Sequence, residues 1–520
     1  MSQREAMTDH GSQAPFPACR TRGLRDRGGR GLPEHGHEVL RLFGKNTLWL
    51  LLDRAGLKVG AMLAGVILVG YLGPANVGIY STALAVGCLL NALLDLGLTR
   101  YAARAVAATP GEAQSFLALS LTSTVVATLV ELCAAAAAYY SGNWYWTCLC
   151  VGFIFTNLDG TASACGGVLS ADLRSRDVLP GSVLNALGVV GIIALVVRFR
   201  LSVLALLVGL TVKSLIVLLV RLWQLRAFWP SSWNYFTPHA FVRLAKRSWV
   251  FFSYSLTQIG YEKVAIISFG LVADVEHVGL FSTALLIAGI FPSFTYAASD
   301  ALLPVMTRLY EDGRTQDLLE LRRRLINLLL HLSVPIGIAL AVFAPQVCQL
   351  LGNRFVASAI ILRIAASRSL LSVLDNFLGQ AGLTAVARVR ERRNAQAIGL
   401  VLCAALTVAL GALWGGQGAA VATLLADLFI VSQYFRVYGR IGLGVECPAL
   451  WSSLVAGCAM ALACFVVPHS RWYLNAAASL LVYFVVLAVI ARGLLADSAA
   501  TFRQCFIPAH EGTLSNGSVA

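Results

Sequence analysis

The phrase VGIYSTAL at residues 77–84 returns almost unchanged as VGLFSTAL at residues 278–285. Six of the eight positions are identical, and the other two exchange Ile for Leu and Tyr for Phe. Each copy follows a long apolar stretch and a short turn, and each opens another long apolar stretch. A hairpin of apolar helices that occurs twice in one chain is typical of transporters built from internal repeats.

The composition indicates a protein that lies largely within a membrane. The 520 residues are 58% hydrophobic and only 13% charged, and the mean hydropathy is +0.74. A soluble protein of this size needs far more charge to cover its surface. Apolar runs of about 20 residues, long enough to cross a hydrocarbon core of about 30 Å as helices, recur along almost the whole chain.

These runs predict an all-α integral membrane protein with about fourteen transmembrane helices. The predicted spans are 48–72, 76–98, 114–140, 144–170, 180–198, 202–223, 248–273, 277–304, 326–350, 357–382, 395–414, 416–438, 449–468 and 473–493. The repeated phrase opens the second and the eighth span, so both copies enter the membrane in the same direction. We therefore predict two six-helix bundles related as a parallel repeat, plus two additional C-terminal helices.

The net charge of +14 is concentrated on one side of the predicted spans. Alternate connections hold nearly all of the Arg and Lys, and the other connections contain only Arg198, Arg200, Arg354 and Arg471. Connections rich in Arg and Lys stay in the cytoplasm. The bias therefore predicts that both termini are cytoplasmic, and it accounts for the basic charge without a nucleic-acid partner.

The same patterns divide the chain into six parts. We expect a disordered cytoplasmic tail at 1–43, a first bundle at 44–225, a cytoplasmic interfacial linker at 226–247, a second bundle at 248–440, two further transmembrane helices at 441–495 and a cytoplasmic tail at 496–520. The first part is rich in Gly and Arg and has no early apolar core, which argues against a signal peptide. The linker mixes aromatic and basic residues, as amphipathic segments at a membrane surface do.

Ionisable side chains inside the predicted spans are candidate functional residues, because burying them in lipid is costly unless they are paired or hydrated. Arg54 and Lys58 are four residues apart in the first span and share one helix face. Glu262 and Lys263 lie in the seventh span, and Arg368 lies in the tenth. The alternative for each is a side chain that reaches the membrane surface or pairs locally.

Other patterns argue against catalysis by the chain itself. Neither a P-loop, G-x-x-x-x-G-K-[ST], nor a metal-ligand spacing of Cys and His occurs. The predicted outer loops are short and leave no room for a catalytic domain. We expect a protein that is not an enzyme and has no metal and no cofactor.

The segment YLGPANVGIYSTALAVGCLLNALLDLGLTRYAARAVA, residues 71–107, resembles the polysaccharide-biosynthesis flippases of bacterial O-antigen and exopolysaccharide pathways. That family has a Leu-Gly-Pro turn, a Gly-x-Tyr start to the second span and Asp-Leu-Gly-Leu before a basic loop. The matching residues are Leu72, Gly73, Pro74, Gly78, Tyr80, Asp95, Leu96, Gly97 and Leu98. The run Tyr261-Glu262-Lys263 and the second phrase resemble the family more weakly, and the resemblance extends over roughly 44–440.

This family belongs to the multidrug/oligosaccharidyl-lipid/polysaccharide exporter superfamily. The resemblance implies a V-shaped pair of bundles around a cationic cavity in the bacterial inner membrane. The substrate would be an oligosaccharide linked to undecaprenyl diphosphate, moved by alternating access and coupled to H⁺ or Na⁺, with a polysaccharide polymerase complex as a further partner. Within this interpretation, the substrate-binding residues are Arg54, Lys58, Lys263 and Arg368, and the ion-coupling residues are Asp159, Glu262 and Asp427.

Two other functions stay open at this point. A multidrug or other lipid exporter of the same superfamily would share the fold, although cationic drugs favour an acidic cavity and this chain has Arg and Lys at mid-depth. A polytopic oligosaccharide polymerase or ligase would be expected to carry a large periplasmic loop with catalytic residues, and the predicted outer loops are too short for one.

Overall fold

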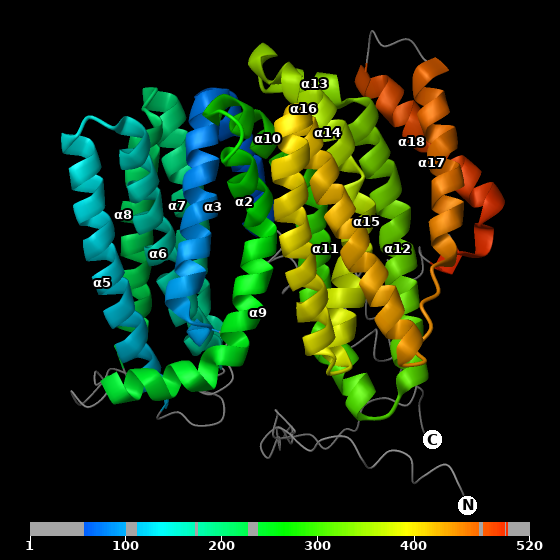
Figure 1. The fold of residues 1–520 in the computed structure, drawn as a ribbon. Coiled ribbons are helices and arrows are strands. Elements are labelled where there is room, and N and C mark those ends of the chain that lie inside the picture. Colours follow the sequence, from blue (N-terminus) through cyan, green and yellow to red (C-terminus); the bar gives the residue numbers. More distant parts are fainter. Residues whose placement is uncertain are drawn as a thin grey trace, which may run out of the picture.

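The computed structural model describes residues 57–99, 112–171, 175–226, 238–466, 472–494 and 496–497. All regular structure in these ranges is helical, and the long helices stand side by side (Figure 1). The first half contains α2 (Leu57–Leu72), α3 (Pro74–Asp95), α5 (Glu112–Tyr140), α6 (Trp144–Ala171), α7 (Ser175–Phe199) and α8 (Val203–Gln224).

The second half contains more helices because several of its spans are broken. These are α9 (Pro238–Gly270), α10 (Val275–Ala288), α11 (Ile290–Glu311), α12 (Thr315–Val342), α13 (Ala344–Leu350), η4 (Asn353–Ser358), α14 (Ala359–Ala366), α15 (Arg368–Leu374), the π-helix η5 (Asp375–Leu383), α16 (Val389–Arg440), α17 (Pro448–Val466) and α18 (Trp472–Ile490).

The helices confirm the predicted all-α membrane fold. In the described ranges, nine are long and apolar enough to cross a membrane, or ten if α10 and α11, which meet at 48°, form one bent span. Every predicted span overlaps at least one helix, whereas the number fourteen stays a prediction. The predicted spans 395–414 and 416–438 are the two arms of α16, which break at Gly415, where φ is 60° and ψ is −142°.

The end of α3 shows how local sequence sets a helix boundary. Leu96 and Gly97 have positive φ angles of 49° and 73°, which stops the helix. Asp95 accepts a hydrogen bond from the backbone nitrogen of Thr99 at 3.1 Å. A Cβ added to Gly97 would lie 2.2 Å from the backbone nitrogen of Phe252 in α9. The Asp-Leu-Gly turn is therefore a packing element between the two halves.

Four clusters of buried apolar side chains hold the helices together. One lies among α5, α6, α8 and the turn that follows α3, around Phe116 and Leu169, and a second lies among α11, α12, η5 and α16 around Phe377. α17 and α18 pack on each other, and α17 packs on α12, around Tyr483. The largest cluster joins the halves and includes Phe269 of α9, beside α10. Many large apolar side chains still face outward, as a hydrocarbon environment allows.

The two copies of the repeated phrase contact each other where α3 packs against α10. A Cβ added to Gly78 would lie 1.9 Å from the carbonyl oxygen of Val275, and one added to Gly279 would lie 1.8 Å from that of Pro74. Gly78 and Gly279 are 201 residues apart, and so are Pro74 and Val275. A reciprocal contact of this kind is what a two-fold relation between repeats produces.

The connections alternate between the two ends of the molecule. The turns that join α2 to α3 and α9 to α10 lie at the upper end in Figure 1, and so does the break in α16. The turn between α11 and α12 lies at the lower end. The predicted tail at 1–43 and most of that at 496–520 lie outside the described residues. The last residues of the predicted linker, from Pro238 on, belong to α9, whose first part lies across the lower end.

Candidate functional site

A cavity of about 680 Å³ lies between the two halves of the chain. Its walls come from α2 and α3 in the first half, and from α9, α10, α11, α15, η5 and α16 in the second. Among the described residues, the charged side chains that line it are Glu262, Lys263, Arg368, Asp375, Arg392 and Asp427. All six belong to the second half. The described part of the first half contributes small, apolar and hydroxyl-bearing residues such as Ser81.

Lys263 and Asp427 lie deep within the predicted membrane region. Lys263 precedes the upper turn at Asp274 by 11 residues, and Asp427 follows the break at Gly415 by 12. At about 1.5 Å per residue, both lie about 16–18 Å below the upper end. That depth is near the middle of a hydrocarbon core about 30 Å thick.

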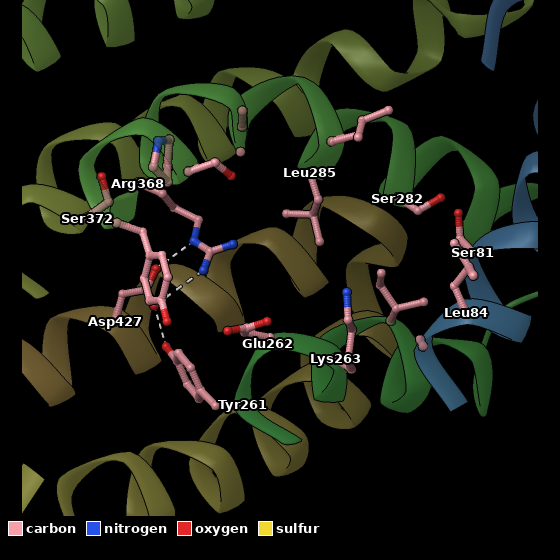
Figure 2. Close-up of a pocket in the computed structure, with 18 of the residues that line it drawn as sticks. Ser81, Leu84, Tyr261, Glu262, Lys263, Ser282, Leu285, Arg368, Ser372 and Asp427 are labelled. Atoms are coloured by element: carbon pink, nitrogen blue, oxygen red, sulfur yellow. Dashed lines mark hydrogen bonds and ion pairs between the residues drawn. The ribbon is translucent and has the colours of Figure 1, made fainter. Parts of the chain in front are cut away.

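Arg368 and Asp427 form an ion pair at one side of the cavity (Figure 2). The Nε atom of Arg368 donates to Oδ2 of Asp427 at 2.6 Å, and Nη2 donates to Oδ1 at 3.5 Å. The hydroxyl of Tyr261 also donates to Oδ1 of Asp427. Asp427 is 14% exposed and Arg368 is 32% exposed, so the guanidinium is the more accessible member of the pair.

Glu262 and Lys263 project into the same cavity from α9 (Figure 2). Glu262 accepts a long hydrogen bond, 3.5 Å, from Gln258, which also donates to the hydroxyl of Tyr296 at 3.4 Å. Lys263 forms no ion pair with any residue that the structure describes. Its ammonium group is therefore available to an anion, whereas the guanidinium of Arg368 is already engaged.

Arg392 lines the cavity although it lies in the basic connection between the predicted spans 357–382 and 395–414. Only 2% of the residue is exposed. Its guanidinium lies over the ring of Tyr254, 5.1 Å from the centroid, and donates to the Tyr254 hydroxyl. Gln396 lies one helical turn further along α16 and also lines the cavity. The spacing of four residues between Arg392 and Gln396 is the sequence signal that could have identified this face.

Asp159 lies within the first half and not among the residues that line the cavity. It accepts a hydrogen bond from the Nζ atom of Lys213 at 2.9 Å and another from the hydroxyl of Ser214 at 3.1 Å. The ammonium of Lys213 also lies 5.3 Å from the ring centroid of Phe155. The side chain of Lys213 is 5% exposed and that of Asp159 is 33% exposed. This ion pair joins α6 to α8, and the ion-coupling role of Asp159 stays a prediction.

We expect Asp159→Ala to destabilise the protein by about 3 kcal/mol, because it leaves the buried ammonium of Lys213 without its carboxylate. Lys213→Met should destabilise the protein less, since it keeps the apolar stem and leaves unpaired only the Asp159 carboxylate, which is one-third exposed. The double variant Asp159→Ala/Lys213→Met should be more stable than Asp159→Ala alone. Thermal unfolding of the purified protein in detergent measures all three. If Lys213→Met destabilises the protein as much as Asp159→Ala does, the buried ammonium of Lys213 is not the main source of the destabilisation.

The remaining predicted site residues belong to the first span. Arg54 lies outside the described residues, and for Lys58, in the first turn of α2, only the backbone is described. The structure thus brings four predicted residues to one cavity: Glu262, Lys263, Arg368 and Asp427.

Comparison with known proteins gives one family match. The family model for "Polysaccharide biosynthesis protein" matches residues 43–310. No curated protein matches the chain.

Several solved membrane transporters share the fold. The lipid II flippase MurJ, in an inward closed conformation, has a TM-score of 0.64 at 12% identity, over 87% of this chain and 99% of that one. A mutant of the MATE transporter VcmN from Vibrio cholerae has a TM-score of 0.52 at 14% identity, over 78% and 98%. An inward-facing multidrug resistance MATE transporter of the MOP superfamily has a TM-score of 0.51 at 15% identity, over 76% and 99%.

Proposed function

The chain belongs to the polysaccharide biosynthesis protein family, and we propose that it is a flippase for polyprenyl-diphosphate-linked oligosaccharide units. It is a multi-pass membrane protein, and we place it in the bacterial inner membrane with both termini in the cytoplasm. There it would supply units for O-antigen, capsule or exopolysaccharide. Its partners would be the lipid-linked unit, the bilayer, a coupling H⁺ or Na⁺ and a polysaccharide polymerase complex.

The observation that carries this proposal is the position of Lys263 and Arg368 in one cavity at mid-membrane depth. A diphosphate carries negative charge that is costly to move through lipid, and charge-assisted hydrogen bonds to Lys and Arg offset that cost. The same cavity holds neutral hydrogen-bonding side chains suited to sugar hydroxyls: Tyr80, Ser81, Gln258, Ser293, Tyr296, Ser372, Asn376 and Gln396.

Alternating access would use the contact between the two repeated phrases. Gly78 and Gly279 meet at the upper end of α3 and α10, and the cavity-lining residues of these helices follow directly along the chain. The turn between α11 and α12, with Arg314 in it and Arg308, Arg322, Arg323 and Arg324 in the helices on either side, lies at the opposite end, which the charge bias assigns to the cytoplasm. We therefore propose that this glycine contact closes the periplasmic end of the cavity and separates when the cavity opens outward.

A multidrug exporter is the second candidate, and one observation favours it. Three acidic side chains, Glu262, Asp375 and Asp427, line the cavity beside the three basic ones. Cationic drugs would pair with such carboxylates. Asp427, however, is occupied by Arg368 and Tyr261, and Lys263, which has no ion-pair partner in the described part of the chain, would repel a cationic drug from Glu262 and Asp375.

The proposal is tested by surface polymer in a host that lacks its own oligosaccharide flippase. We expect the wild-type protein to restore polymer when a suitable sugar unit is supplied, and Lys58→Ala to reduce it if the first span adds a cation to the cavity. Variants are compared at equal membrane levels. Drug efflux without polymer, after several sugar units have been tried, would favour the multidrug exporter instead.

A further inference from the structure

The ion pair at the side of the cavity has the geometry of an anion site that is already filled. Two nitrogen atoms of Arg368 donate to the two carboxylate oxygens of Asp427, at 2.6 and 3.5 Å. A guanidinium offers the same planar two-point contact to a phosphate group. Arg368 borders the open cavity, and Asp427 lies behind it and is less exposed.

We propose that Asp427 and the anionic group of the substrate compete for Arg368, and that a cation takes the place of Arg368 on Asp427 when the substrate binds. This inference rests on the proposed function and adds the residue at which substrate and coupling ion would meet. The exchange makes and breaks only ion pairs and hydrogen bonds. The diphosphate gains the guanidinium, and the Asp427 carboxylate gains H⁺ or Na⁺.

Charge balance requires the incoming cation. If a diphosphate removed Arg368 from Asp427, a carboxylate that is 14% exposed would lose its counter-ion. Leaving one member of a buried pair unpaired costs about 3–5 kcal/mol. Lys263 is poorly placed to take over, because it lies across the cavity from Asp427, beyond Glu262, in Figure 2. Tyr261 can keep its hydrogen bond but brings no positive charge.

The other ionisable groups around Asp427 strengthen this requirement. Asp375 of η5 and Cys403 of α16 interact electrostatically with the Asp427–Arg368–Tyr261 group, and Glu262 of α9 interacts with Asp375. Glu262 and Asp375 add negative charge near a bare carboxylate. α10 and α14, which also pack on α16, contribute no charged side chain to the lining of this cavity among the described residues.

Because binding energies are reciprocal, a cation that enables substrate binding must itself bind better when substrate is present. We expect the dissociation constant of a diphosphate to fall by up to about tenfold for each tenfold rise in the coupling cation. Asp427→Asn removes the competing charge. This variant should bind the diphosphate more tightly than the wild type and without dependence on the cation.

The experiment measures binding of inorganic pyrophosphate and of undecaprenyl diphosphate to the purified full-length protein over ranges of pH and Na⁺. Asp312→Asn, the same change at an exposed turn, should behave as the wild type. Tyr261→Phe is a second test that leaves both charges in place. Because Tyr261 can keep its hydrogen bond to Asp427 whether or not Arg368 is bound there, this variant should keep the cation dependence.

The outcomes separate this inference from the proposed function. If the wild type binds a diphosphate with an affinity that depends on neither H⁺ nor Na⁺, the exchange is wrong and the flippase proposal still stands. Weaker binding by Asp427→Asn, with Asp312→Asn unchanged, would also overturn it, because Asp427 would then be positioning Arg368 for the substrate. If neither the wild type nor Asp427→Asn binds either diphosphate, both the exchange and the diphosphate substrate are wrong.

Discussion

Lys263→Glu should abolish export of lipid-linked oligosaccharide. Lys263 lines the cavity at mid-membrane depth and has no ion-pair partner among the residues described. A charged hydrogen bond is worth about 1.5–3 kcal/mol, and a carboxylate at this position would also repel the diphosphate beside Glu262. Together these effects reduce substrate affinity by roughly a hundredfold or more. Flipping of a labelled lipid-linked oligosaccharide in proteoliposomes, with surface polymer in cells, measures the loss.

Two variants control for this change. Lys263→Arg keeps the positive charge and should retain much of the activity. Lys246→Glu reverses a charge on the same helix at an exposed position and should leave export close to that of the wild type. Export by Lys263→Glu at the wild-type rate, in protein of normal thermal stability, would remove Lys263 from the substrate site.

Gly279→Leu should prevent the upper ends of α3 and α10 from closing and should stop transport. A Cβ at this position would lie 1.8 Å from the carbonyl oxygen of Pro74. The neighbour is backbone, so no side-chain rotation relieves the overlap. Overpacking usually costs about 1–3 kcal/mol, and a backbone clash at the centre of the contact should exceed that. Gly78→Leu should act in the same way, because the contact is reciprocal.

Thiol labelling detects the effect on conformation. Ser81→Cys places a thiol in the cavity just below the glycine contact. A membrane-impermeant maleimide added from the periplasmic side should label it more in Gly279→Leu than in the otherwise wild-type protein. Gly191→Leu is the matched control, since nothing lies within 4 Å of a Cβ added there. Normal transport by Gly279→Leu would show that closure does not need this contact.

The sequence predicted the fold because the signals for it are local. Lipid demands apolar runs of a set length, so the spans could be located from composition alone. The repeated phrase predicted a parallel repeat, and the reciprocal contact of Gly78 and Gly279 agrees with it. The breaks at Gly415 in α16 and at Gly97 after α3 also follow from single residues.

The candidate site could be predicted only as a set of charges within spans. That criterion selected Lys263 and Arg368, which do line the cavity. It also selected Asp159, whose partner Lys213 lies 54 residues away on another helix. It missed Arg392, because a position near a helix end does not show which way the side chain faces.

Pairing was decided by the tertiary structure alone. Arg368 meets Asp427 across 59 residues of sequence, and Tyr261 meets it across 166. Hydropathy reports how each residue interacts with the surrounding lipid, and that can be read one helix at a time. Whether a buried charge is free to bind a ligand or already neutralised depends on helices far apart in the chain. Only the packing of α9, α15 and α16 around one cavity shows that Lys263 is available and Arg368 is occupied.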